Sequence, residues 1–348
     1  MTPTSAPRRP LVVLHDHLDG GLRPESVLEL ADGCGHILPT SDVDTLRAWF
    51  HQGRSGSLER YLEAFVHTVA VMQTAEAVER VAYEAATDLA ADGVVYAEVR
   101  FDPGLCTMGG LDRFDVVEAA LAGLSRARRD TDLAVYLVVS GLRHRSDTME
   151  AARAAVRFRG EGVVGFDIAG PEAGYPPDDH LPAIRAAAEA GLGITLHAGE
   201  GAGPHSMWSA LVRCGARRIG HGVRIVDDTD FDGRAIDELG RFATQVRDQQ
   251  IPLEVAVTSN IHTGTFESAA VHPFGALLTA GFNVSVNTDN RLMSNVTVSS
   301  EYELVREAFG LDEADLGIIS VRVLEAGFGP WPERRRIIDD VVGPAYGV

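Results

Sequence analysis

The chain has 348 residues and a formal net charge of −19 at pH 7, and all 31 of its basic residues are arginine because the sequence contains no lysine. Such an acidic chain lacks the basic footprint that nucleic acid or an anionic membrane requires, so we expect neither as a partner. The absence of a lysine amine also excludes Schiff-base chemistry, a P-loop and a carboxylated lysine that bridges two metal ions.

Apolar runs rich in β-branched residues predict eight strands, at residues 11–14, 94–99, 134–139, 163–168, 193–196, 217–219, 252–257 and 282–286. From the second run onward the strands recur about every thirty residues, and amphipathic stretches such as 150–159 and 184–190 lie between them. Strands and helices that alternate in this way form a parallel sheet. Eight such units favour an α/β fold of the (β/α)₈ TIM-barrel type over a doubly wound sheet.

The connection between the first two predicted strands is much longer than the others. Residues 22–92 carry helical patterns at 24–31, 58–71 and 75–91. Because the loops that follow barrel strands surround the active site, we expect this helical insert to cover the barrel mouth and close the substrate pocket. The alternative is that it only elaborates the outer ring of helices. No linker divides the chain, so residues 1–348 are predicted to form a single domain.

The N-terminal region and the cysteines bear on the cellular compartment. Only the four apolar residues 11–14 follow Arg8 and Arg9 before charged residues return, which is too few for a secretory signal, and no apolar run is long enough to span a bilayer. Cys34, Cys106 and Cys214 have neither disulfide nor metal-site spacing. We therefore expect a cytoplasmic protein with reduced thiols.

Four polar motifs come after predicted strands. They are His15-Asp16-His17, His197-Ala198-Gly199-Glu200, Gly220-His221-Gly222 and Asn287-Thr288-Asp289-Asn290. Residues two apart on a strand point the same way, so His15 and His17 can face one metal ion. Barrel enzymes build their sites from polar groups at the carboxyl ends of strands, and imidazole and carboxylate groups are zinc ligands. The motifs therefore predict a hydrolase with a single catalytic metal.

Together with Thr258-Ser259-Asn260, these motifs resemble, in order and spacing, the motif series of the adenosine deaminase family, and the resemblance covers the chain from about residue 10 to the final helices. It implies a (β/α)₈ barrel with one Zn²⁺ per chain, bound by His15, His17, His197 and Asp289. It also implies that Glu200 donates a proton to N1 of the purine, while His221 and Asp289 orient the zinc-activated hydroxide that attacks C6. Protonation of N1 stabilises the charge that develops when the aromatic carbon is attacked, so Glu200 needs a pKa raised by a dry pocket.

The resemblance further places four residues against the substrate, namely His17, Asp19, Gly170 and Asn290. Asp19 resembles the position that contacts the ribose 5′-hydroxyl, and an aspartate there favours a nucleoside over a free base. Gly170 resembles the glycine whose N–H meets purine N3. Asn290 departs from the aspartate of the most familiar members, yet its NH₂ group can donate to the N7 acceptor without first being protonated.

The expected function is hydrolytic deamination of adenosine, and of 2′-deoxyadenosine, to inosine and ammonia, so the expected partner is a small purine nucleoside. The sequence does not determine the oligomeric state. One alternative is a deaminase of a modified adenine nucleoside or of adenine, because Asn290 and the glycine-rich residues 201–204 depart from the family pattern. A second alternative is a catalytically silent purine-binding barrel. The remaining histidines, among them His144 and His272, have no ligand spacing and are expected at the surface or in packing.

Overall fold

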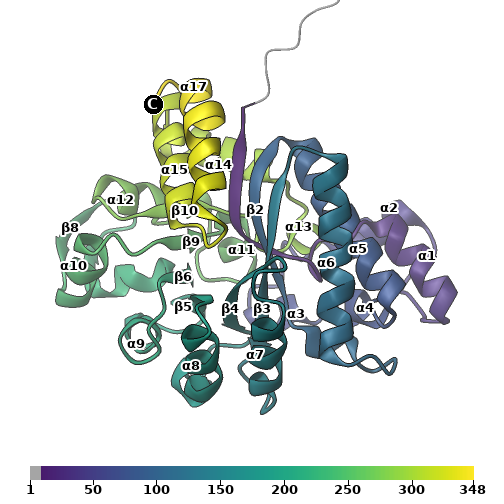
Figure 1. Cartoon of the computed structure of the whole chain (residues 1–348). Coiled ribbons are helices and arrows are strands. Elements are labelled where there is room, and N and C mark those ends of the chain that lie inside the picture. The colour runs from purple at the N-terminus through teal and green to yellow at the C-terminus, as the bar shows by residue number, and fades with distance from the viewer. Residues whose placement is uncertain (1–8) are drawn as a thin grey trace, which may run out of the picture.

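The computed structural model describes residues 9–348, which form a barrel of parallel strands surrounded by helices (Figure 1). In this part of the chain one eight-stranded sheet has the order β1-β2-β3-β4-β5-β6-β9-β10, and its paired strands are parallel. The strands are β1 (Leu11–His17), β2 (Val94–Phe101), β3 (Ala134–Leu142), β4 (Val163–Ala169), β5 (Gly193–Ala198), β6 (Arg218–His221), β9 (Leu253–Val255) and β10 (Val284–Val286). The (β/α)₈ prediction is confirmed.

The observed strands differ from the predicted ones mainly at their ends. β1 continues to His17, past the predicted end at residue 14, because Asp16 and His17 pair with Val99 and Arg100 of β2. The first metal motif is therefore part of the sheet and shares its rigidity. A short antiparallel pair, β7 (Thr229–Phe231) with β8 (Ile236–Leu239), forms a separate sheet that the sequence reading did not predict.

The barrel closes between β10 and β1 through a seam made by the Asn287-Thr288-Asp289 motif. The Asn287 Oδ1 atom accepts the N–H groups of Leu14 and His15 at 3.0 and 3.1 Å. The Asp289 N–H donates to the His15 carbonyl at 3.0 Å, and the Asp289 carbonyl accepts from the His17 N–H at 2.7 Å. The seam thus brings the last motif of the chain against the first.

The helical insert between β1 and β2 is confirmed, and it occupies the right side of Figure 1. It contains α1 (Pro24–Cys34), α2 (Val43–Phe50), α3 (Leu58–Leu62), α4 (Phe65–Ala70) and α5 (Ala75–Asp92). The prediction of one helix over 58–71 is wrong. The chain tightens where the Glu63 N–H donates to the Arg60 carbonyl three residues earlier, at 3.2 Å, and α3 ends there. Tyr61 of α3 and Phe65 of α4 both line the same cavity.

The other helices surround the barrel or follow its strands. The stretches 150–159 and 184–190 correspond to α7 (Thr148–Arg157) and α8 (Leu181–Glu189). Within residues 9–348, no helix is both long and apolar enough to cross a membrane. The remaining helices are α6 (Arg113–Asp130), α9 (Pro204–Trp208), α10 (Arg241–Asp248), α11 (Val257–His262), α12 (Phe274–Thr279), α13 (Arg291–Ser294), α14 (Val298–Phe309), α15 (Glu313–Ala326), α16 (Trp331–Ile337) and α17 (Gly343–Tyr346).

A network of buried charges fills the barrel interior. Glu254 of β9 accepts hydrogen bonds from Arg100 of β2 at 2.8 Å, from Arg218 of β6 at 2.7 Å and from Thr195 of β5 at 2.9 Å. Arg100 also donates to Asp167 of β4 at 3.0 Å. Charges removed from water need such partners, because an unpaired one is strongly destabilising. The network therefore holds two carboxylates, Glu254 and Asp167, rigidly inside the barrel.

Candidate active site

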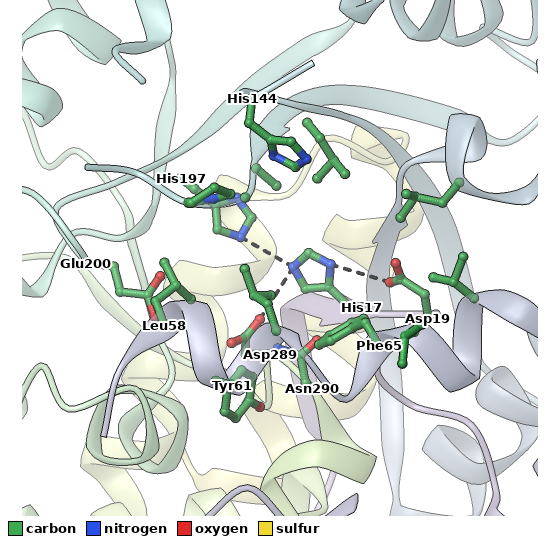
Figure 2. A pocket seen from close by; sticks show the side chains of 18 of the residues that line it. His17, Asp19, Leu58, Tyr61, Phe65, His144, His197, Glu200, Asp289 and Asn290 are labelled. Carbon is green, nitrogen blue, oxygen red and sulfur yellow. Dashed lines mark hydrogen bonds and ion pairs between the residues drawn. The ribbon is translucent and has the colours of Figure 1, made fainter. Parts of the chain in front are cut away.

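The polar motifs meet in one cavity of about 310 Å³. Its polar wall comes from residues at or just beyond the carboxyl ends of barrel strands, and its apolar wall comes largely from the insert. Figure 2 shows Leu58, Tyr61 and Phe65 close to the histidines and carboxylates. Such a chamber strengthens electrostatic interactions by excluding water. The polar wall includes His17, Asp19, His197, Glu200, His221, Asp289 and Asn290, and α3 and α4 contribute Leu58, Tyr61, Leu62, Phe65, Val66 and Val69.

The structure brings four potential metal ligands together, and this group differs from the expected set because it holds His221 in place of His17. One ligand atom from each of His15, His197, His221 and Asp289 lies within 4.8 Å of the others. His17 borders this group, since its Nε2 atom is 3.3 Å from His197 Nε2 and 3.4 Å from Asp289 Oδ1 (Figure 2). Imidazole nitrogens and a carboxylate at these separations are a donor set suited to zinc.

Two carboxylates from the barrel interior set the orientation of His15 and His197. His15 Nδ1 is 3.1 Å from Glu254, and His197 Nδ1 is 2.9 Å from Asp167. Each Nδ1–H therefore donates to a carboxylate, which leaves the Nε2 lone pair for a metal ion. His15 Nε2 is buried without a hydrogen-bond partner, and burial lowers the pKa of His197 to about 3, so it is neutral as a metal ligand must be.

The sequence reading missed Glu254 and Asp167 as supports of the histidines. The available signal was a single acidic residue inside each of two apolar runs, 252–257 and 163–168. A charge at such a position is rarely fully buried unless it is paired. The partner, however, lies on a distant strand and cannot be identified from a single sequence.

Asp289 and His221 both adopt left-handed backbone conformations, with φ of 56° and 62°. This region is uncommon for residues other than glycine, and such strain is concentrated at functional sites. Ser259 of α11 donates to Asp289 Oδ2 at 2.6 Å. Although burial opposes ionisation, the facing His15, His221 and His17 hold the pKa of Asp289 well below its usual range. Asp289 is therefore a carboxylate in this site.

Glu200 has the opposite character. Its side chain is buried, burial raises its pKa, and the nearby charges of Asp289 and Glu172 act in the same direction. One carboxyl oxygen lies 3.5 Å from His221 Nε2, and the other is buried without a hydrogen-bond partner. Glu200 is thus a carboxylic acid that keeps its proton to a higher pH than an exposed glutamate, as the sequence analysis required.

The backbone around Glu200 is fixed by Glu172, a residue that the sequence reading missed. The Glu172 carboxylate accepts the consecutive N–H groups of Gly199, Glu200, Gly201 and Ala202 at 2.8 to 3.0 Å. The start of the glycine-rich loop is therefore anchored at four points.

The residues expected to contact the substrate all line the cavity. Asp19, Gly170 and Asn290 lie on its wall, and Gly170 has φ of 95°, which a side chain would strain. The Asn290 amide oxygen packs so closely on Gly20 that a Cβ atom there would lie 2.1 Å from it. His144, expected at the surface or in packing, also lines the cavity (Figure 2).

Comparison with known proteins agrees with this site. The profile of the adenosine deaminase family matches residues 10–344. The adenosine deaminase of Mycobacterium tuberculosis is 50% identical over 344 residues, which cover 97% of this chain and 94% of that protein. Among solved structures, adenine deaminase from Arthrobacter aurescens superposes with a TM-score of 0.84 at 25% identity, covering 96% of this chain and 98% of that one. The N6-mAMP deaminase of Arabidopsis gives a TM-score of 0.81 at 26% identity, covering 94% and 96%. The chain belongs to the adenosine deaminase family.

Proposed function

We propose that this protein is a zinc-dependent enzyme that hydrolyses adenosine and 2′-deoxyadenosine to inosine and ammonia. The observation that carries the proposal is that a buried Glu200, whose pKa is raised by burial, lies beside the histidine and aspartate cluster in one cavity. A buried acid beside a candidate metal site supplies the two things that attack on an aromatic amidine requires, a proton for the ring nitrogen and an activated nucleophile.

We propose His15, His17, His197 and Asp289 as the zinc ligands, with one ion per chain. The Nε2 atom of His15, which makes no hydrogen bond and lies 3.3 Å from Asp289 Oδ1, supports this assignment, as do the carboxylate-oriented Nδ1 atoms of His15 and His197. The Nε2 atoms of His17 and His197 lie 3.3 Å apart, which is close enough for both to face one metal ion. When bound, zinc lowers the pKa of a water molecule and so supplies the nucleophile at neutral pH.

The chain's own residues would then act on the purine. Attack at C6 moves an electron pair onto N1. Glu200 donates its proton to N1, so that this ring nitrogen ends neutral and does not carry a negative charge. His221 and Asp289 orient the nucleophile toward C6 by donating and accepting hydrogen bonds, respectively. Asp19, Gly170 and Asn290 are proposed to bind the 5′-hydroxyl, N3 and N7. His17, the cavity-lining member of the ligand set, also borders the substrate.

The charge of the cavity favours a nucleoside over a nucleotide. Of the described residues that line it, none is an arginine, and the sequence has no lysine. A 5′-phosphate would therefore enter a chamber that presents Asp19 and no arginine or lysine side chain, although phosphate recognition commonly depends on such side chains. In this respect we expect the substrate to differ from the nucleotide in the name of the Arabidopsis N6-mAMP deaminase.

The test is ammonia release from the zinc-loaded protein with adenosine, 2′-deoxyadenosine, N6-methyladenosine, adenine and AMP. We expect the first two to have the highest kcat/KM and AMP the lowest. A preference for adenine or N6-methyladenosine would support the alternative substrates. No release from any of the five, with stoichiometric zinc bound, would refute the proposed activity and favour a silent purine-binding barrel.

A further inference from the structure

We infer that Asn260 and His272 are positioning residues that hold His221 with its proton on Nε2, so that His221 presents an N–H group to the reacting centre. This inference rests on the proposed function for its catalytic meaning. The three side chains are buried, with exposed fractions of 0%, 4% and 1% for Asn260, His272 and His221. They form a chain of hydrogen bonds that starts at a backbone amide.

The donor and acceptor of every hydrogen bond in this series follow from the first one, which the Phe274 N–H donates. The Phe274 N–H, at the start of α12, points at His272 Nδ1 at 3.2 Å. A backbone N–H can only donate, so His272 Nδ1 must accept. Since a neutral imidazole carries its single proton on the other nitrogen, His272 Nε2 is the donor. Burial between Phe266 and Phe309 keeps the ring neutral and lowers the pKa of His272 to about 3.

The second and third hydrogen bonds, from His272 to Asn260 and from Asn260 to His221, then determine which nitrogen of His221 carries the proton. His272 Nε2 lies 3.3 Å from Asn260 Oδ1, which accepts. The other end of the same amide is an NH₂ group, which can only donate, and it lies 3.1 Å from His221 Nδ1. His221 Nδ1 therefore accepts, and the His221 proton resides on Nε2, which is 3.5 Å from Glu200. The opposite amide orientation would set an NH₂ group against the His272 N–H.

The position of its proton distinguishes His221 from the neighbouring histidines. His15 and His197 direct an Nδ1–H toward a carboxylate and present a lone pair, whereas His221 presents an N–H. A nitrogen that already carries a proton cannot remove one from a nucleophile. It can donate a hydrogen bond that orients the nucleophile or stabilises charge. The series of hydrogen bonds that begins at Phe274 thus makes His221 an orienting donor, and not a metal ligand or a general base.

The decisive variant is Asn260→Asp, which has a nearly identical shape. An aspartate oxygen facing His221 can only accept, so the imidazole should move its proton to Nδ1 and turn a lone pair toward the centre. Loss of the correct imidazole tautomer in a serine protease triad lowers kcat by about 10⁴. We expect kcat to fall about 10²- to 10⁴-fold, KM to change less than about threefold, and zinc content to stay stoichiometric. Asn283→Asp, at a partly buried asparagine that donates to the Gln250 carbonyl, is the matched control and should leave kcat unchanged.

A second pair of variants tests the outer end of the chain. His272→Gln retains an N–H donor near the Nε2 position and should keep kcat within about threefold, whereas His272→Leu removes the donor and frees the Asn260 amide to rotate. We expect His272→Leu to be at least about tenfold slower than His272→Gln. If Asn260→Asp fails to fold, this comparison still decides the inference, since equal kcat values for the two His272 variants would overturn it.

A spectroscopic readout is independent of activity. In zinc-loaded protein labelled with ¹⁵N-histidine, the His221 signals are identified as those lost in His221→Gln. We expect a proton on Nε2 in the parent protein and on Nδ1 in Asn260→Asp. A proton on Nδ1 in the parent, or on Nε2 in both proteins, would overturn the inference. A parent protein with the expected tautomer but no deaminase activity would instead refute the proposed function while leaving the hydrogen-bond chain intact.

Discussion

The contact between Gly20 and Asn290 allows a direct test of the proposed hydrogen bond from Asn290 to purine N7. A Cβ atom on Gly20 would lie 2.1 Å from Asn290 Oδ1 and 2.8 Å from both Asn290 Cβ and Cγ. Ordinary contacts of this kind exceed about 3.4 Å, so in Gly20→Ala the amide must retreat by roughly 1 Å. Gly20 lacks the positive φ that alanine would strain. The variant should therefore act through Asn290 and not through the local backbone.

If the Asn290 amide donates to N7, this displacement breaks a buried hydrogen bond worth about 1–3 kcal/mol, equivalent to about a 5- to 150-fold loss. We expect kcat/KM for adenosine to fall by that factor in Gly20→Ala. The inhibition constant of 7-deazaadenosine, which has a C–H group in place of N7, should stay within about twofold of the parent value. Both constants are measured by ammonia release with adenosine as the substrate.

The control is Gly33→Ala on α1, where a Cβ atom would meet nothing within 4 Å. This variant should leave both constants unchanged. An equal loss of adenosine activity and 7-deazaadenosine affinity in Gly20→Ala would show that Asn290 does not read N7. It would also shift the interpretation toward a general distortion of the cavity.

Three further predictions concern the metal, the acid and a remote carboxyl group. His15→Ala and His197→Ala should each lose zinc and activity together, and stoichiometric zinc in either purified variant would contradict the ligand assignment. Glu200→Gln should retain zinc and lower kcat by about 10²- to 10⁴-fold, and turnover within a few-fold of the parent would assign the proton to another group. Burial raises the pKa of Glu301 to about 7, so the folded state holds an extra proton between about pH 5 and pH 7 and the free energy of unfolding should fall as the pH rises through that range. Glu301→Gln should abolish this dependence and stabilise the protein at pH 8 by up to about 3 kcal/mol. The prediction would be disproved if urea unfolding gave the same change in unfolding free energy between pH 5 and pH 8 for the parent and the variant.

Much of the site was predictable because its motifs sit at strand ends. The alternation of side chains along a strand makes His15 and His17 face the same way, and this depends only on their spacing of two residues. The barrel architecture followed from the repeat of apolar runs and amphipathic stretches. The break in the predicted helix 58–71 was not predictable, because no proline or glycine marks it. In the structure the helix ends where the Glu63 N–H donates to the Arg60 carbonyl.

The sequence by itself thus determined which groups could do the chemistry, since residue types and local periodicity are read within a few positions of each other. Only the tertiary structure decided how those groups are supported. Glu254 and Asp167 orient His15 and His197 across the barrel, Glu172 anchors the loop of Glu200, and Asn260 sets the polarity of His221. Each support is a hydrogen bond between distant segments of the chain. The physical reason is that a buried polar group takes whichever partner the packed elements bring within about 3 Å, and that partner is set by topology and not by neighbouring residues.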